Sequence, residues 1–400
     1  TGLAYSDNRL RGESTREHDV WFFPRLEFSV LHGGDRLRAH GSGELQRERS
    51  LGGVVDDRLR ARAALVVDWA ILPHRFYWTF QDIANVQAID PLAADQPSNQ
   101  QQTNVLLTGP IVEFGSPQSL LGRLESRVAH AWAQESDNFE HDRYALAGSV
   151  RRQSTPLTSW SLGAEASSVE FRNFGDLNDF ARQDVYLQYD HELPRSGLQL
   201  VGGYTWVDRA VGDDISRALL RARLRWSPGA DDEFLINATD ELSDAGRDLT
   251  VELTADDRIQ RENRRALIGP DVHRLRSLEL RWRHRHTRTE FEIASFARDF
   301  DYLQADQGLE RRAHGLWMSV GRKLTPLVSL HAQAGSAWFE FEGPARRDQD
   351  SYLSLHLERR LTPRWLLRAE VSRFLRDSDL ADASYRENSV ALHLVYAGGR

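Results

Sequence analysis

The chain has 400 residues, a formal net charge of −8 at neutral pH and no cysteine. Cysteine chemistry and disulfide frameworks are therefore excluded, and arginines spread among acidic residues in an acidic chain argue against a nucleic-acid partner. The longest apolar run, near residues 63–72, is broken by Asp68 and falls far short of the roughly 20 residues that a membrane-spanning helix needs. No linker-like stretch appears, so we expect a single domain over residues 1–400. The first residues carry neither an initiator Met nor a leader, so we expect a processed chain.

Apolar and polar residues alternate with a period of two through the chain, which predicts β-strands. The alternation is visible in segments 22–30, 36–45, 59–69, 120–128, 143–151, 353–358 and 390–396. The clearest run is Arg217–Trp226, in which one face carries four arginines and the other face is apolar. A turn at Ser227–Asp232 and a second alternating strand, Glu233–Thr239, complete a hairpin. The chain is therefore predicted to be a series of antiparallel hairpins.

Short turn signals recur at nearly constant spacing, roughly 34 to 44 residues apart, except for one double gap that a polar junction at Arg285–Arg288 fills. The others fall at Gly33–Asp35, Leu72–His74, Ser116–Gln118, Thr155–Pro156, Leu193–Gly197, Ser227–Gly229, Leu324–Pro326 and Leu361–Pro363. Nine tight turns join eighteen strands, and the segments 3–8 and 389–396 add one strand at each end. We therefore expect about twenty strands, with eighteen as the alternative.

The polar face of these strands must point away from lipid. An Arg on the lipid face near the bilayer midplane costs about 2–4 kcal/mol, so the four in Arg217–Arg225 would cost on the order of 10 kcal/mol, comparable to the stability of a whole domain. The tight turns gather on one rim and longer polar loops on the other. The sequence thus predicts an all-β fold, a closed antiparallel transmembrane β-barrel in the outer membrane of a Gram-negative bacterium, with periplasmic turns, extracellular loops and outer-membrane lipid around it.

Three segments fit this pattern less well. Pro24 and Pro110 lie inside predicted strands, where each requires a bulge or a position near a rim. The segment 240–271 is long for a loop, and Leu249, Val251 and Leu253 alternate within it. It is either an extracellular hairpin that folds inward or an additional strand pair.

The motifs of the common enzyme classes are absent from the sequence. It contains no Walker loop, no HExxH and no serine elbow, so we expect no catalytic residue and no cofactor. Histidines are scattered one per strand, and acidic pairs such as Asp213–Asp214 and Asp256–Asp257 fall in loops. We therefore expect no metal site.

Arginines on the polar faces of the strands are the candidate functional residues. We expect the following eleven to line the lumen: Arg60, Arg62, Arg123, Arg127, Arg217, Arg221, Arg223, Arg225, Arg276, Arg281 and Arg283. Guanidinium groups bind carboxylates and sulfates bidentately, so such a wall favours passage of anionic solutes, including acidic polysaccharide. The alternative is that these arginines pair with Glu and Asp of neighbouring strands and rigidify the wall. Both interpretations remain open at this point.

Two short stretches resemble a known family. The opening Tyr5–Asn8, and the segments Asn85–Pro91, Pro97–Gln100, Thr103–Val105 and Thr108–Pro110, resemble the outer-membrane β-barrels associated with exopolysaccharide and PEP-CTERM gene systems. The resemblance implies a channel that exports an anionic exopolysaccharide together with a periplasmic export component, and it brings no catalytic residues. Two other functions are compatible with the same barrel: a porin for small anionic solutes, and a plugged, non-conducting scaffold that displays its extracellular loops.

Overall fold

The structure is a computed structural model. It describes residues 1–14, 16–90, 93, 96–173, 175–251, 271–303, 310–343, 346–381 and 383–398. Within these residues, one sheet of 21 β-segments and a few short helices make up the fold. No helix in this part of the chain is both long and apolar enough to cross a membrane.

Successive β-segments alternate in direction along the chain, except that β2 and β3 run in the same direction. They are β1 (Gly2–Ser6), β2 (Asp19–Phe23), β3 (Arg25–Gly33), β4 (Leu37–Ser50), β5 (Arg58–Leu72), β6 (Phe76–Ala88), β7 (Gln100–Gly115), β8 (Leu120–Ala133), β9 (His141–Thr155), β10 (Thr158–Phe171), β11 (Phe180–Leu193), β12 (Ser196–Arg209), β13 (Ile215–Trp226), β14 (Asp232–Ser243), β15 (His273–Arg285), β16 (Thr289–Tyr302), β17 (Arg311–Thr325), β18 (Val328–Phe341), β19 (Arg346–Arg360), β20 (Trp365–Ser378) and β21 (Tyr385–Tyr396). The helices are η1 (Pro97–Asn99), η2 (Asp137–Phe139), η3 (Gly175–Asn178) and α1 (Ala245–Val251).

The 21 segments form twenty strands, because β2 and β3 are two halves of one strand. Both halves pair with β4 in a single register, and the break falls at Pro24, which has no N–H to donate. The Pro24 carbonyl still accepts a hydrogen bond from the Arg47 N–H at 3.1 Å. β1 pairs antiparallel with β2 on one side and β21 on the other, which closes the barrel. The predicted closed antiparallel barrel of about twenty strands is confirmed, and the alternative count of eighteen is wrong.

Pro110 interrupts the ladder between β7 and β8 without changing its register. The pairs Thr108↔Val128 and Ile111↔Glu125 flank the gap, and no residue is inserted between them. Gly109, next to it, lies so close to β8 that an added Cβ would meet the Ser126 carbonyl oxygen at 1.8 Å. The chain thus accommodates this proline by losing local hydrogen bonds, and the predicted bulge is not needed.

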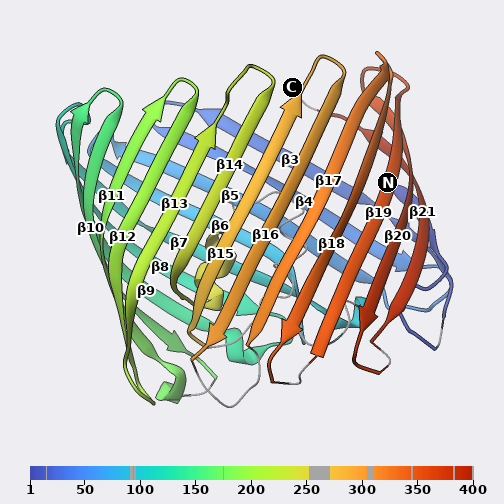
Figure 1. Ribbon diagram of the computed structural model, residues 1–400, viewed down its shortest axis with the longest axis horizontal. Coiled ribbons are helices and arrows are strands. Elements are labelled where there is room, and N and C mark those ends of the chain that lie inside the picture. Colours follow the sequence, from blue (N-terminus) through green and yellow to red (C-terminus); the bar gives the residue numbers. More distant parts are fainter. Residues whose placement is uncertain are drawn as a thin grey trace.

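The two rims differ in the length of their connections. Nine connections of two to five residues gather at one rim, which is the upper rim in Figure 1. They span residues 34–36, 73–75, 116–119, 156–157, 194–195, 227–231, 286–288, 326–327 and 361–364. The other rim carries connections of up to 29 residues, the longest being 244–272. Each predicted tight turn falls at one of these nine connections.

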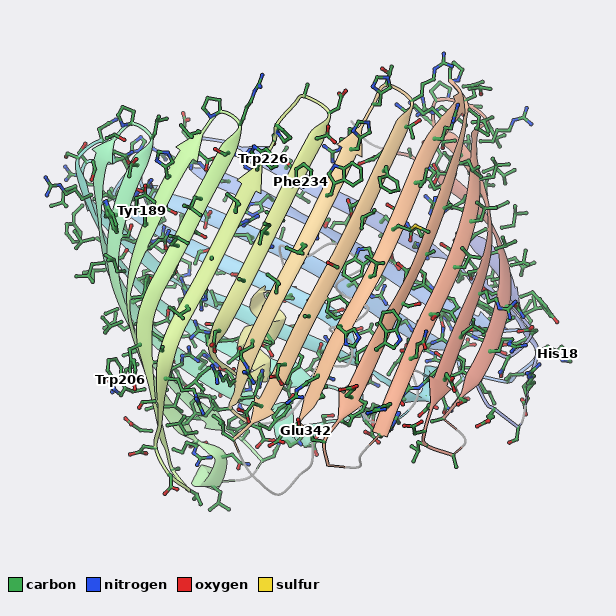
Figure 2. The ribbon with its side chains drawn as sticks, in the orientation of Figure 1. His18, Tyr189, Trp206, Trp226, Phe234 and Glu342 are labelled. Carbon is green, nitrogen blue, oxygen red and sulfur yellow. The ribbon has the colours of Figure 1, made fainter. Side chains whose placement is uncertain are left out.

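The two faces of the wall follow the alternation in the sequence. In β13, Leu220, Leu224 and Trp226 are exposed on the outer surface, whereas Leu219 is buried on the lumen side with the arginines. Aromatic side chains lie near both edges of the apolar band. Figure 2 shows Tyr189, Trp226 and Phe234 near the short-turn rim and Trp206 near the long-loop rim, as in the aromatic girdles of membrane barrels.

Candidate functional site

The longest connection brings part of the chain into the lumen. Pairing between β13 and β14 ends at Leu220↔Asp240, whereas β14 stays paired with β15 as far as Ser243↔His273. β14 therefore separates from β13 at its long-loop end and leads into α1, which lies inside the barrel (Figure 1). Leu242 is fully buried against Phe171 and other inward apolar side chains of β10–β12.

This observation decides between the two interpretations of segment 240–271 for the residues that the structure describes. Residues 240–251 fold inward, as one interpretation required, and residues 245–251 of them form a helix; the rest of the segment up to residue 270 lies outside the described residues. Leu249 and Val251 belong to α1, so the strand predicted from their alternation is wrong. Leu253 lies outside the described residues.

A network of ion pairs fixes α1 to the inner wall. Asp184 of β11 is paired with Arg182 at 2.9 Å and with Arg247 of α1 at 3.0 Å, and it also accepts a hydrogen bond from the Thr205 hydroxyl. The Arg182 guanidinium also donates to the Leu242 carbonyl at 2.7 Å. Strand β11 therefore holds both the entry to α1 and the helix itself.

A second ion pair joins Asp244, just before α1, to Arg143 of β9. Burial alone would raise the pKa of Asp244, but the adjacent Arg143 guanidinium outweighs it and holds this pKa well below its ordinary range. Burial would likewise lower the pKa of Arg247, but Asp184 and the nearby carboxylates Glu165 and Glu241 raise it. Asp244 and Arg247, whose ion pairs hold α1 to the wall, are therefore fully charged at neutral pH.

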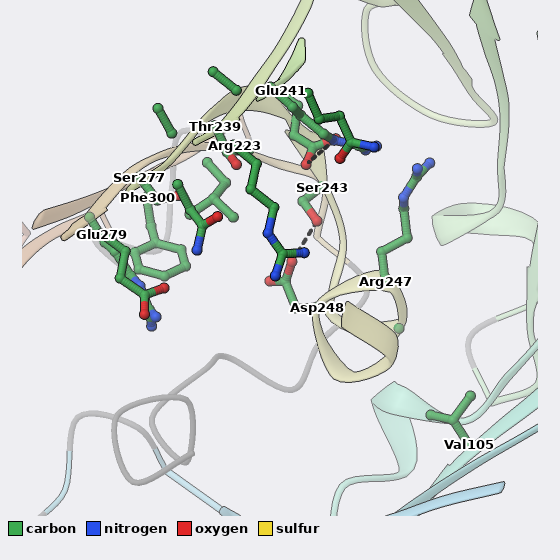
Figure 3. A pocket seen from close by; sticks show the side chains of 18 of the residues that line it. Val105, Arg223, Thr239, Glu241, Ser243, Arg247, Asp248, Ser277, Glu279 and Phe300 are labelled. Carbon is green, nitrogen blue, oxygen red and sulfur yellow. Dashed lines mark hydrogen bonds and ion pairs between the residues drawn. The ribbon is translucent and has the colours of Figure 1, made fainter. Parts of the chain in front are cut away.

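A cavity of about 750 Å³ lies between α1 and the wall. Figure 3 shows it from close by, with Arg223 of β13, Glu241 of β14 and Arg247 of α1 around it. The lining contains nine arginines, Arg127, Arg143, Arg221, Arg223, Arg225, Arg247, Arg281, Arg298 and Arg311, against five carboxylates, Glu165, Glu233, Glu241, Asp248 and Glu279. Four of these arginines, Arg127, Arg143, Arg225 and Arg247, pair with carboxylates that lie outside the lining, namely Glu125, Asp244, Glu192 and Asp184. The cavity wall is therefore rich in arginine, but ion pairs neutralise most of its positive charge.

Ten of the eleven predicted arginines lie on the lumen side. Arg276 does not, and its place in that set is corrected. It shares the outer face of β15 with the exposed Leu278 and Leu280, while Ser277 and Glu279 line the cavity. Because side chains alternate along a strand, Arg276 must point outward, where it pairs with Asp299 of β16.

Most of the eleven arginines are paired with carboxylates. The pairs are Arg60–Glu48, Arg123–Glu113 and Arg123–Glu125, Arg127–Glu125, Arg221–Glu241, Arg225–Glu192, Arg276–Asp299, Arg281–Glu279, and Arg283 with Glu233, Glu290 and Glu292. In the described part of the chain, Arg62, Arg217 and Arg223 have no ion pair. The two interpretations of these arginines therefore apply to different residues: eight brace the wall, and three keep a free charge.

Four cavity arginines were absent from the predicted set: Arg143, Arg247, Arg298 and Arg311. Arg143 alternates with Tyr144 and Leu146 on β9, so its parity alone identifies it as inward-facing. Arg247 lies on α1, which the strand pattern does not anticipate. Among the described residues, no group of three or more His, Asp and Glu side chains is placed to hold a metal ion.

The closed wall, the apolar outer band and the polar lumen together fix the surroundings of the chain. Each strand pairs with a neighbour on both sides and the sheet closes on itself, so the wall has no free edge strand, and this architecture with an apolar outer face belongs to Gram-negative outer membranes. The protein is an outer-membrane β-barrel. Its predicted localisation is thereby confirmed.

No protein-family model and no curated protein matches the chain. Among solved structures it is similar to the siderophore receptor PirA from Pseudomonas aeruginosa, with 11% identity over 99% of this chain and 79% of that chain and a TM-score of 0.46. It is also similar to the FrpB iron transporter from Neisseria meningitidis, with 8% identity, coverage of 98% and 81%, and a TM-score of 0.46. Similarity at this level carries no information about the substrate, and the barrel assignment rests on the strand pairing described above.

Proposed function

We propose that the protein is an outer-membrane channel for anionic solutes, and that its substrate is an acidic exopolysaccharide that it exports. The arginine-rich lining of the lumen cavity, in which Arg223 has no ion pair among the described residues, is the observation that carries this proposal. A pore that concentrates cationic groups in a low-dielectric wall attracts anions and repels cations. Arginine forks also suit the carboxylates or sulfates of an acidic sugar chain.

The stretch that resembles the exopolysaccharide-associated barrels supports the same proposal. It covers the long-loop end of the β6–β7 hairpin, where β6 is paired with β5 only as far as Ala63↔Ala84. Beyond that pair, the Gln102 side chain donates to the Ala61 carbonyl at 2.8 Å and accepts from the Ala61 N–H at 3.0 Å. Val105 and Ile83 of this hairpin pack in one cluster with Ala245 of α1. The resembling residues thus help to support the helix that borders the cavity.

A porin for small anionic solutes is the second candidate. The cavity volume of about 750 Å³ is within the range of roughly 300–1,000 Å³ that is usual for small-molecule sites. Both candidates predict anion selectivity, and they differ in whether a long acidic polymer enters the lumen.

Planar-bilayer recording of the purified full chain tests the proposal. We expect a reversal potential in a salt gradient that reports anion preference, and block of the current by oligogalacturonate but not by neutral dextran of equal length. The triple variant Arg221→Gln, Arg223→Gln, Arg281→Gln should lose the preference, whereas Arg276→Gln, on the outer face, should keep it.

Three results would count against the proposal. Block by small organic anions with no effect of the acidic oligomer would favour the porin. Cation preference in the parent protein would remove both transport candidates for anions. Absence of current, even after deletion of residues 245–270, would leave the non-conducting scaffold.

A further inference from the structure

A groove of about 430 Å³ crosses the outer wall at β17–β20. Its outward-facing floor consists of small residues, Ala334, Ser336 and Ser351, and the two hydroxyls share a hydrogen bond at 2.7 Å. Larger outward side chains border it, among them Met318, Trp338 and Leu353. A shallow channel between large apolar side chains therefore runs along a surface that faces lipid.

The groove lies in the half of the wall nearer the long loops. Ser336 and Ser351 are each five residues from the long-loop ends of β18 (Val328–Phe341) and β19 (Arg346–Arg360), and the groove extends from there to Leu353 at the middle of β19. Long loops are extracellular in barrels of this kind. The groove is therefore exposed to the outer leaflet of the membrane.

Two arginines without an ion pair in the described structure lie at the edge of this groove. Arg373 lines it from β20, and Arg386 is on the neighbouring strand β21. Both side chains are exposed on the outer face, the same face as Leu375 and Val390. Leu375 pairs with Arg386 and Arg373 with Asn388, so the two arginines are diagonal neighbours, about 7–8 Å apart at their Cα atoms.

The position of Arg373 requires an anionic partner. Leu375 lies between it and the rim, so the guanidinium is set among lipid-facing side chains and not in the loops. An unpaired arginine on a lipid face is destabilising to a degree that grows with depth. Asp377, the carboxylate on the outer face of β20, lies beyond Leu375 at the rim, and no ion pair joins it to Arg373.

We infer that this groove binds the phosphorylated glycolipid of the outer leaflet, lipid A or its lipopolysaccharide, with one acyl chain along the floor and a phosphate on Arg373 and Arg386. Phosphate is the anion that outer-leaflet lipid supplies at this depth, and a guanidinium fork binds it bidentately. The small residues of the floor leave room for an acyl chain. The large side chains elsewhere on the wall leave no such room. The Ser336–Ser351 hydrogen bond engages both hydroxyl groups, which lowers the free-energy cost of covering them with an acyl chain.

Native mass spectrometry of the detergent-solubilised full chain tests this inference. The probes are bis-phosphorylated lipid A, the same lipid without its phosphates, and phosphatidylglycerol. We expect bis-phosphorylated lipid A to be retained preferentially, and the double variant Arg373→Gln, Arg386→Gln to weaken its binding by about tenfold or more, since a hydrogen bond to a charged group is lost at each position. Ala334→Phe, which fills the floor, should weaken binding with both arginines present.

Arg359→Gln is the matched control, because Arg359 is an exposed arginine near the short-turn end of β19. It should leave lipid A binding unchanged, and heat-dependent migration on gels establishes that each variant is folded. Equal retention by the parent protein and the double variant would overturn the inference. So would equal retention of phosphorylated and dephosphorylated lipid A, preference for phosphatidylglycerol, or a dimer or trimer in which a second copy covers the groove.

Discussion

Arg247 of α1 lies 3.0 Å from Asp184 of β11, which ties the helix in the lumen to the barrel wall. Asp184 is only 3% exposed and is also the partner of Arg182, which is 1% exposed. One carboxylate therefore serves two arginines, one that belongs to the wall and one that belongs to the inserted segment. The position of α1 in the pore depends on this shared contact. Replacing Arg247 and replacing Asp184 therefore have different consequences.

Arg247→Gln is expected to loosen α1 and leave the wall intact, because Arg182 still neutralises Asp184. We expect a loss of about 1–3 kcal/mol at most, the value of hydrogen bonds to a charged group, together with larger or noisier single-channel currents. Asp184→Asn should instead cost roughly 3–5 kcal/mol, since it leaves Arg182 buried without its counter-ion. Urea unfolding in lipid vesicles and single-channel recording measure the two effects. Equal destabilisation by both variants would contradict the division of roles.

The Arg143–Asp244 tether is expected to persist well into the acidic range. The pKa of Asp244 is lower in the folded protein than its ordinary value of 3.8, so folding releases a proton from this group. Its contribution to stability is therefore complete above that value and is lost as the pH falls below it. The difference in unfolding free energy between the parent protein and Asp244→Asn should be constant from pH 8 to pH 5 and shrink below about pH 4. A difference that already declines between pH 7 and pH 5 would show that Asp244 is not held in this pair.

Arg223 is expected to contribute a net positive charge to ion selectivity, whereas the Arg221–Glu241 pair contributes none. Both line the cavity, but Arg221 is paired with Glu241, whereas Arg223 has no ion pair among the described residues. A free charge about 7 Å from a passing ion in water contributes about 0.6 kcal/mol, roughly a threefold change in local anion concentration. Arg223→Gln should therefore lower the chloride-to-potassium permeability ratio by a factor of this size. Arg221→Gln should lower it by a similar factor, because it leaves the Glu241 carboxylate without its counter-ion. The double variant Arg221→Gln, Glu241→Gln should restore the parent ratio, and reversal potentials distinguish these outcomes.

Gly109→Ala is expected to destabilise the barrel where β7 and β8 approach each other beside Pro110. The new Cβ would meet the Ser126 carbonyl oxygen, a backbone atom that cannot move aside without separating the strands. Overpacking of this kind costs typically about 1–3 kcal/mol. Gly33→Ala is the matched control, since an added Cβ there meets nothing within 4 Å. Urea midpoints and the folded fraction on gels measure both, and a Gly109→Ala variant as stable as the control would contradict the close approach.

The wall of the barrel was predictable because each strand carries its own evidence. The alternation in Arg217–Trp226 specifies an apolar and a polar face, and the cost of arginine in lipid decides which face is outside. The nine tight turns indicated the number of strands. The spacing of the prolines predicted the positions of these turns to within a few residues. Pro24 conflicted with the expectation for a central strand, but the strand contains it with only one backbone N–H donor missing and with an unchanged register.

The lumen was less predictable, for reasons visible in particular residues. Arg276 was assigned to the lumen from its residue type in an arginine-rich segment. It lies two residues before Leu278 in β15, so the two side chains share the outer face. Arg223 and Arg221 have the same parity and similar neighbours in sequence, yet only Arg221 has a carboxylate within reach, on a strand that follows it along the chain. Which arginines are free is therefore a property of strand register.

The sequence by itself determined the closed barrel, its strand number and its membrane, because period-two patterning and the free energy of charge in lipid act on each strand locally. Only the tertiary structure decided that β14 separates from β13 beyond Asp240, that α1 enters the pore, and that Arg143 pairs with Asp244 and Asp184 with Arg247 there. Those contacts join residues up to 101 positions apart in the chain, and their free energy depends on the distance between side chains across the lumen, which no local pattern encodes.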